Sequence, residues 1–175
     1  MFRHAEPLLP LPAYARRLAV VHRTYQGLGP PGAAVHEFDA LGTYATQLFM
    51  LQLECDPMGA DDMALRVAID GLGTAAYHFT RRRRYYDAFA PASNAHRKGN
   101  GRLSDPAEAR AAFEALSPYA QRLLALRIRC RPFGYDWCAL DIARLGLETA
   151  AFHFTRIANF YGAKADSSGA IGPRS

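Results

Sequence analysis

The sequence contains one stretch twice: GLGTAAYHFTR at residues 71–81 and GLETAAFHFTR at residues 146–156. The 75-residue offset aligns residues 38–86 with 113–161 without a gap, and 24 of these 49 positions are identical. Self-similarity at a fixed period is typical of architectures built from repeated units. We therefore predict an internally duplicated chain with pseudo-two-fold symmetry.

Composition and charge favour a folded, basic protein. The chain has 175 residues, half of them apolar, which is enough to bury a hydrophobic core. Its 21 Lys and Arg outnumber its 16 Asp and Glu, and the net charge of +5 favours an anionic partner. Residues 81–102 contain seven Lys and Arg but one acid, so this window carries the whole excess.

The cysteines and the hydropathy pattern bear on location. Cys55, Cys130 and Cys138 are an odd set without a disulfide framework, which suits a reducing compartment. The N-terminus lacks the apolar core of a signal peptide, and no apolar run is long enough to span a bilayer. We expect a cytoplasmic protein that does not enter a membrane.

Five segments are expected along the chain. They are an N-terminal extended segment and helix (1–30), a first helical repeat (31–90), a basic linker loop (91–104), a second helical repeat (105–165) and a disordered tail (166–175). The linker and the tail are assigned from their small, polar residues, since such segments bury little apolar surface.

Turn and cap signals place the first helices. Apolar residues at helical spacing predict a helix over 13–26 that ends at Gly27. The sequence GLGPPGAA at 27–34 is typical of a linker. In the second repeat, Asp105-Pro106-Ala107-Glu108 predicts a capping box that begins a helix over 106–115.

Each repeat then predicts a shorter helix, a tight turn and a longer helix. The shorter helix spans about 38–55 in the first repeat and about 118–130 in the second, where Ser117 is expected to cap it. The alternating residues LRIRCR that end the second copy also fit a short strand, but the Leu- and Ala-rich residues before them favour helix. The longer helices are expected to end near Tyr86 and Tyr161.

Two features of the longer helices predict how they pack. Gly71 and Gly146 lie inside them, at a cost of about 1 kcal/mol each relative to alanine, which close helix packing would offset. Asp61 and Asp136 stand at the expected N-cap positions. The buried stripe should comprise Leu65, Ala68, Leu72, Ala75 and Phe79 with Leu140, Ala143, Leu147, Ala150 and Phe154. The predicted fold is all-α: duplicated helical hairpins that form a pseudo-two-fold bundle with an extra N-terminal helix.

A second, more polar stripe on the longer helices is a candidate ligand site. If the helices cross on the pseudo-two-fold axis, the two histidines face each other or line one cavity. Alternatively, each histidine is bound to Tyr44, Tyr119 or a backbone carbonyl. The candidate residues are Thr74, His78, Thr149 and His153.

A metal site is a weaker alternative. Cys55, His78, Cys130 and His153 form a Cys₂His₂ set, which suits tetrahedral zinc. Their spacing is unlike that of a zinc finger, and the cysteines end apolar stripes, where free cysteine behaves as a small hydrophobe. We therefore expect neither a metal nor another cofactor.

The basic window is the main candidate for function. Four consecutive arginines beside tyrosines and a Gly-rich basic loop can bind phosphates and stack on bases. The simpler interpretation is a solvated helix end whose arginines complement the helix dipole. The candidate nucleic-acid-binding residues are Arg81, Arg82, Arg83, Arg84, Tyr85, Arg97, Lys98 and Arg102.

One further stretch bears on nucleic-acid binding. Residues 116–128 followed by 135–139 faintly resemble the start of the helix-turn-helix in sigma factor region four. The match departs at the turn, where Ala143 stands in place of glycine, so no residue roles are carried over.

The function hypotheses follow from these features. The chain has no phosphate-binding glycine loop, nucleophile elbow or His-Glu-x-x-His motif, which favours a non-enzymatic protein. We expect nucleic-acid binding, with a role in transcription regulation. The alternatives are a helical module that binds an acidic protein and a small-ligand or metal site at the His/Cys cluster.

Overall fold

The computed structural model of the protein describes residues 25–91 and 98–162. Within these ranges the chain forms six α-helices and two short 3₁₀-helices, and no strands. The expected all-α class is confirmed. The predicted helix over 13–26 lies outside the described residues except for Tyr25 and Gln26, which are not helical. The candidate Arg97 and the predicted tail also lie outside the described residues.

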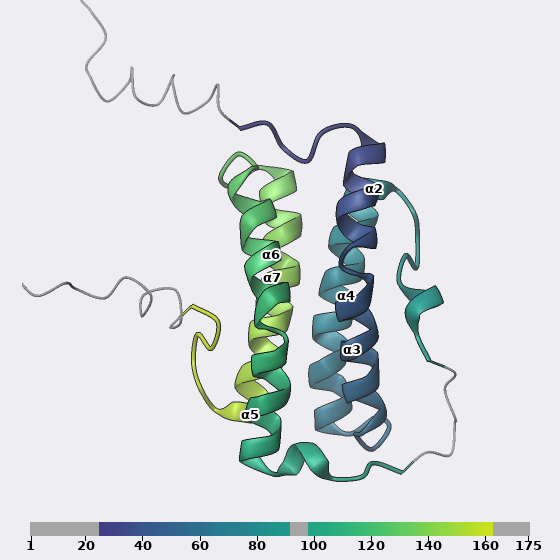
Figure 1. The fold of residues 1–175 in the computed structure, drawn as a ribbon, viewed down its shortest axis with the longest axis vertical. Coiled ribbons are helices and arrows are strands. Elements are labelled where there is room, and N and C mark those ends of the chain that lie inside the picture. Colours follow the sequence, from purple (N-terminus) through teal and green to yellow (C-terminus); the bar gives the residue numbers. More distant parts are fainter. Residues whose placement is uncertain (1–24, 92–97, 163–175) are drawn as a thin grey trace, which may run out of the picture.

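The helices form two hairpins, each extended by a shorter helix. They are α2 (Pro31–Asp39), α3 (Gly42–Leu53), α4 (Ala60–Thr80), α5 (Pro106–Ala115), α6 (Ser117–Ile128) and α7 (Tyr135–Thr155). In Figure 1 the helices of the first half (residues 25–91) and of the second half (residues 98–162) stand as two neighbouring columns. The most extensive contact between elements is that between α4 and α7, the longest helix of each half. None of the helices in the described ranges is long and apolar enough to cross a membrane.

Element boundaries recur along the chain. The helices α5, α6 and α7 begin at residues 106, 117 and 135, each 75 residues after α2, α3 and α4 begin at 31, 42 and 60. The non-glycine residues with positive φ show the same offset: Met58 and Phe133, Arg81 and Arg156, Arg84 and Asn159. Corresponding positions in the two halves can therefore be compared residue by residue.

The core contains most of the stripes that the sequence predicted, although Phe79 and Phe154 at their ends are only partly buried. Leu65, Ala68, Leu72 and Ala75 of α4 are buried, as are their counterparts Leu140, Ala143, Leu147 and Ala150 of α7. Between the hairpins the rings of Tyr44 and Tyr119 stack with their centroids 5.4 Å apart. Tyr119 is fully buried, and this burial raises the pKa of its hydroxyl.

The predicted role of the two glycines in α4 and α7 is confirmed. A Cβ atom on Gly71 would lie 3.0 Å from the carbonyl oxygen of Ile142, and one on Gly146 would lie 2.8 Å from that of Val67. Real Cβ atoms do not approach backbone this closely. Glycine at both positions therefore allows the backbones of α4 and α7 to meet.

The N-terminal boundaries of the first half differ from those predicted. The expected linker over 27–34 is partly helix, because α2 begins at Pro31, a residue that suits the first turn. The expected single helix over 38–55 is divided, since α2 ends at Asp39 and α3 begins at Gly42. The sequence correctly placed the helix over 106–115, which is α5.

The cap predictions were right for one helix and wrong for three. The Asp105 carboxylate accepts hydrogen bonds from the backbone N–H groups of Ala107 and Glu108, as predicted. Leu116 rather than Ser117 is the N-cap of α6, and glycines rather than Asp61 and Asp136 are the N-caps of α4 and α7. The two aspartates lie in the first helical turns, which leaves their side chains free for tertiary contacts.

The long helices end six residues earlier than predicted, at Thr80 and Thr155. The Thr80 hydroxyl donates to the Ala76 carbonyl at 2.7 Å and accepts from the Arg82 N–H at 3.2 Å. Arg81 takes a left-handed conformation with φ 59°, which turns the chain away from the helix. The run Arg81–Arg84 is therefore a loop and not a helical turn.

The helix-turn-helix resemblance is not supported by the structure. The turn that the motif needs would fall near Ala143 and Gly146. Both residues lie inside α7, which runs without interruption from Tyr135 to Thr155.

Candidate nucleic-acid interface

The loop Arg81–Arg84 concentrates positive charge beside the end of α4. All four arginine side chains are exposed. Arg84 is paired with Asp87 through an Nε–Oδ2 distance of 2.6 Å. Within the described residues Arg81, Arg82 and Arg83 have no acidic partner at salt-bridge distance. The loop therefore presents unneutralised cations to solvent, which is what binding to a polyanion requires.

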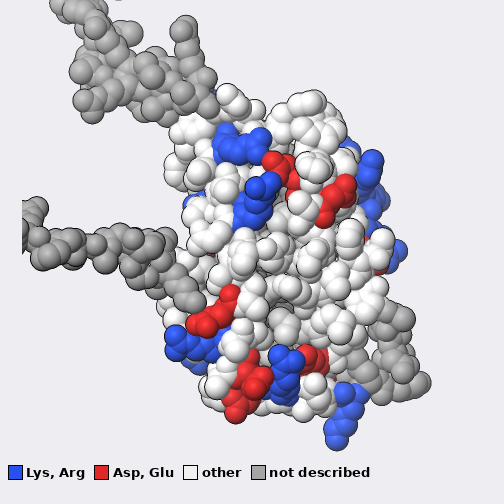
Figure 2. All heavy atoms as spheres, viewed as in Figure 1, with Lys and Arg blue, Asp and Glu red and all other residues white. Residues whose placement is uncertain are grey.

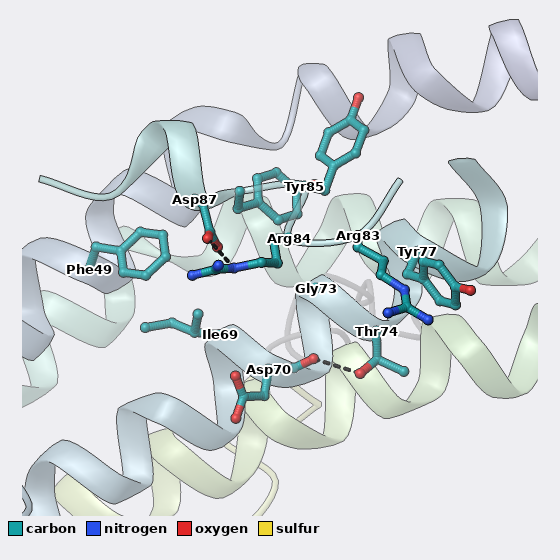
Figure 3. A pocket seen from close by; sticks show the side chains of 11 residues that line it. Phe49, Ile69, Asp70, Gly73, Thr74, Tyr77, Arg83, Arg84, Tyr85 and Asp87 are labelled. Atoms are coloured by element: carbon teal, nitrogen blue, oxygen red, sulfur yellow. Dashed lines mark hydrogen bonds and ion pairs between the residues drawn. The ribbon is translucent and has the colours of Figure 1, made fainter. Parts of the chain in front are cut away.

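A pocket of about 580 Å³ lies against this loop, open to solvent. Figure 3 shows that α4 forms its floor and the segment of Arg83, Arg84 and Asp87 its rim. Its lining comprises Phe49, Ile69, Asp70, Gly73, Thr74, Tyr77, Arg83, Arg84, Tyr85, Tyr86 and Asp87. The pocket thus combines cationic, aromatic and carboxylate groups.

Two arginines enter this pocket in different ways. In Figure 3 the guanidinium of Arg83 lies beside Thr74 and Tyr77, whereas Arg84 extends over Ile69 toward Asp87. Asp70 also lines the pocket, but in Figure 3 its carboxylate points away from both arginines, and its backbone oxygen accepts from the Thr74 hydroxyl at 2.8 Å. A ligand here would meet the guanidinium donors of the rim and the ring of Tyr77.

The predicted stacking residue Tyr85 has a different role. Its hydroxyl donates toward α2, with oxygens of Asp39 and Val35 at 2.5 and 3.2 Å, and in Figure 3 its ring extends away from the pocket floor. Burial and the bond to Asp39 raise the pKa of Tyr85 to about 12. Tyr85 thus fixes the loop to α2, and Tyr77, 42% exposed, is the accessible ring. Tyr77 is not among the residues predicted for this site, although its position beside the predicted polar stripe was a signal for it.

The remaining predicted basic residues lie elsewhere. Arg102 is paired with Glu54 at 2.9 Å and with Glu108 at 3.2 Å. Glu54 follows the end of α3, next to the start of α4, so Arg102 lies at the opposite end of the bundle from Arg81. Lys98 precedes Gly99, whose N–H donates to the Asp56 carboxylate at 2.8 Å, so Lys98 belongs to the same end as Arg102. The structure therefore does not bring the predicted basic residues into one continuous surface.

The face seen in Figure 2 supports this separation. Lys and Arg side chains gather toward the two ends of the molecule, with Asp and Glu next to them. Between the ends the visible surface is mostly uncharged.

The histidines of the candidate ligand site form tertiary contacts that the sequence did not predict. His78 Nε2 lies 2.8 Å from Asp136 Oδ1, and His153 Nε2 lies 2.7 Å from Asp61 Oδ1. Each contact joins the end of one long helix to the start of the other. Because α4 and α7 are antiparallel, the histidines lie at opposite ends and neither face each other nor line one cavity. The expected bonds to Tyr44 or Tyr119 are also wrong, since those rings stack on each other.

The other members of that candidate site are separated from the histidines. Thr74 and Thr149 line a shallow groove where α4 crosses α7, and their hydroxyls donate to the carbonyls of Asp70 and Leu145. His78 instead borders a pocket of about 400 Å³ with Arg81 and Asp136. No Ser, Thr or Cys lines this second pocket among the described residues, so the His–Asp pair has no adjacent nucleophile there.

The four candidate metal ligands, Cys55, His78, Cys130 and His153, do not form one site in the described structure. The thiols of Cys55 and Cys130 are buried and donate to the carbonyls of Leu51 and Leu126 near the ends of the preceding helices, α3 and α6. Burial raises the pKa of the Cys130 thiol to about 11, which disfavours the thiolate that a metal would need. Within the described ranges no three His, Cys, Asp or Glu side chains are placed to hold a metal ion.

Comparisons with known proteins do not extend these observations. The chain matches no protein-family model, no curated protein and no solved structure.

Proposed function

We propose that the chain consists of two copies of one helical unit related by a pseudo-two-fold axis. The common 75-residue offset of helix starts and of positive-φ residues supports this origin. Contacts between the halves also occur in matched pairs. His78 binds Asp136 while His153 binds Asp61, and the corresponding tyrosines stack on each other. The duplication would supply a scaffold on which one copy has acquired a functional loop.

We further propose that the protein binds nucleic acid without catalysis, with the loop Arg81–Arg84 and the adjacent pocket as the site. One observation carries this proposal: Arg82 and Arg83 are exposed and unpaired within the described chain, beside a pocket with an accessible tyrosine. Cations that track a phosphate backbone next to an aromatic ring are the usual elements of sequence-tolerant binding sites.

The form of the pocket favours a single strand over a duplex. A volume of about 580 Å³ can receive an unstacked base or nucleotide, which a duplex does not offer. The base would stack on Tyr77 while Arg83 contacts a phosphate. A role in transcription regulation and a place in the cytoplasm fit this activity and remain part of the proposal.

The salt dependence of binding tests the site. Binding of a fluorescent single-stranded oligonucleotide is measured over a range of salt for the wild type and for a variant with Arg82, Arg83 and Arg84 replaced by Gln. Each phosphate contact contributes about 0.7 to the log-log salt slope for a single strand, so the variant should lose about two units. Arg81 is left intact because it forms the left-handed end of α4.

A matched control separates a specific site from general charge. The control replaces Arg66, Lys98 and Arg131 by Gln, which removes the same number of charges from exposed positions outside the pocket. We expect it to retain most of the wild-type slope. Equal losses in the two variants would argue against a localised site. No binding of any nucleic acid at low salt would reject the proposal and favour the alternative, an acidic protein partner at the same loop.

A further inference from the structure

The outward faces of α4 and α7 carry large apolar side chains that nothing in the described chain covers. Six such residues are between 42% and 49% exposed: Met63, Val67, Tyr77, Ile142, Leu145 and Phe152. Contiguous apolar surface of this kind is uncommon on a monomer and marks an interaction site. We call these residues, with Asp70, Thr74, Cys138 and Thr149, the α4/α7 face.

The spacing of these residues is that of a helix-packing seam. On α4 they occur at 63, 67, 70, 74 and 77, and on α7 at 138, 142, 145, 149 and 152. Alternating steps of four and three place all of them in one stripe on each helix, as in the a and d positions of a coiled coil. The stripes therefore resemble surfaces that pack against other helices.

The crossing of α4 and α7 shapes this face. A groove of about 420 Å³ runs between the helices, lined by Val67, Asp70, Gly71, Thr74, Ile142, Leu145, Gly146 and Thr149. The glycines and threonines keep its floor low, while Val67, Ile142 and Leu145 rise at its sides. Such a furrow accepts the ridge of an apposed helix.

We propose that a second copy of this chain occupies the α4/α7 face and forms a two-fold dimer. A two-fold axis places this face against its own copy, and the stripes of α4 and α7 carry similar residues except where Asp70 corresponds to Leu145. The charges fit the same arrangement. Arg66 flanks the stripe of α4 and Asp70 lies in it, and neither has an ion-pair partner within the described residues. One face thus carries a positive and a negative side chain, which two copies related by a two-fold axis can pair across the interface.

The area is adequate for such a dimer. A helix of 21 residues is about 31 Å long, and two adjacent helices are about 20 Å wide, which gives roughly 600 Å² per copy. About 1,200 Å² in total is at the lower end of stable interfaces, so we expect a dissociation constant in the micromolar range.

The oligomeric state of the full chain tests this proposal. Sedimentation at about 50 μM should give a wild-type mass near twice 19.3 kDa, and Leu145→Asp should give a mass near 19.3 kDa. Ile128→Asp is the matched control, because Ile128 is an exposed aliphatic residue of α6 outside the face. It should remain dimeric. Phe152→Glu, on the same stripe of α7, repeats the test, and circular dichroism reports the folding of each variant.

Two results would overturn the proposal. One is a monomeric wild type, which would mean that another partner or residues 1–24 of the same chain cover the face. The other is a folded Leu145→Asp or Phe152→Glu chain that remains dimeric. Tyr77, Asp70 and Thr74 belong both to this face and to the pocket beside Arg83, so a dimer would compete with nucleic acid for the Tyr77 ring. Leu145 and Phe152 do not line that pocket, so their variants test dimerisation without altering the residues that border it.

Discussion

The pocket beside Arg83 and the region 75 residues further along the chain have the same helix starts and left-handed turns but different surfaces. The floor residue Gly73 corresponds to Glu148, whose carboxylate accepts from the Tyr161 N–H at 3.3 Å. Burial raises the pKa of Glu148. In the first half a Cβ on Gly73 would meet nothing within 4 Å, so that volume is open. The space that Glu148 occupies in one half is a pocket of about 580 Å³ in the other.

The loops that follow α4 and α7 differ in their side chains as well. Arg82, Arg83 and Arg84 correspond to Ile157, Ala158 and Asn159, although the backbone takes the same left-handed turns in both loops. The second half retains a smaller cavity of about 150 Å³. The comparison indicates that backbone shape is common to the halves, and that a few side chains decide whether a cationic pocket forms. The predictions below test that separation.

The largest effect is expected at the contact between α4 and α7, where both halves require glycine. Gly146→Leu should lower the free energy of unfolding by several kcal/mol, because even its Cβ would lie 2.8 Å from the Val67 carbonyl oxygen. Gly73→Ala is the matched control within a long helix; with no atom near its Cβ, it should stabilise by up to about 1 kcal/mol. Chemical denaturation measures both. Similar effects of the two substitutions would contradict the distinction between packing glycine and pocket glycine.

Filling the pocket tests its role in binding. Gly73→Glu places the side chain of the second half in the first, so it should both occupy the space and oppose phosphate. We expect nucleic-acid affinity to fall about tenfold, which is about 1.4 kcal/mol, with little change in stability. Gly73→Gln separates volume from charge and should cause a smaller loss. Undiminished affinity for Gly73→Glu would exclude the pocket from the binding site.

One ion-pair cluster between the halves has no counterpart at the matched positions, and it gives a prediction for the pH dependence of stability. Glu37 of α2 binds Arg122 and Arg129, and its second-half counterpart is Ala112. Burial alone would raise the pKa of Glu37, but the bonds to Arg129 and Arg122 outweigh it and lower the pKa below 4.5. The ionised form therefore stabilises the fold above about pH 4.5, and this contribution is lost as the pH falls through the folded pKa.

Glu37→Gln measures that contribution. The variant should be less stable than the wild type by about 1 kcal/mol at pH 7, with a difference that shrinks in acid. Asp70→Asn serves as the control, because Asp70 is exposed and has no ion pair within the described chain. A difference for Glu37→Gln that stays constant from pH 7 to about pH 3 would disagree with the lowered pKa.

The smallest effect concerns the matched histidines. His78 and His153 are 26% and 27% exposed in their side chains and bind equivalent aspartates. Each His→Gln change should cost about 0.5 kcal/mol, since partly exposed pairs contribute little, and the two costs should be equal and additive. Thermal denaturation of the single and double variants checks this. A much larger cost at one histidine would show that the halves differ at these contacts too.

The sequence predicted the fold where the determinants were periodic. Buried stripes and close-packed glycines follow from repeated spacing, so Leu72, Gly71 and their counterparts were assigned correctly. Helix ends were harder. After Thr80 the helix ends, because the Thr80 hydroxyl bonds to the backbone and Arg81 takes a left-handed conformation. The position of the following loop also depends on Tyr86, whose hydroxyl donates to the Phe38 carbonyl.

The site was only partly predictable for a related reason. The arginines were visible in the sequence, but Asp61 and Asp136 were assigned as caps because their histidine partners come from the other half. Alignment of the halves did contain the signal for the pocket, since Gly73 and Glu148 are the only mismatch between residues 71–76 and 146–151. That this mismatch leaves a pocket could be recognised only from the position of the loop Arg81–Arg84 relative to α4.

The crossing of α4 and α7 has a consequence for how the chain holds together. Each half contributes one long helix to the central contact, so neither half buries its own share of the core when alone. The covalent connection between the halves therefore keeps them at high effective concentration, and its residues 98–104 add contacts of their own, since Arg102 pairs with Glu54 and Leu103 is buried. A chain cut between residues 91 and 98 should reassemble from its two fragments.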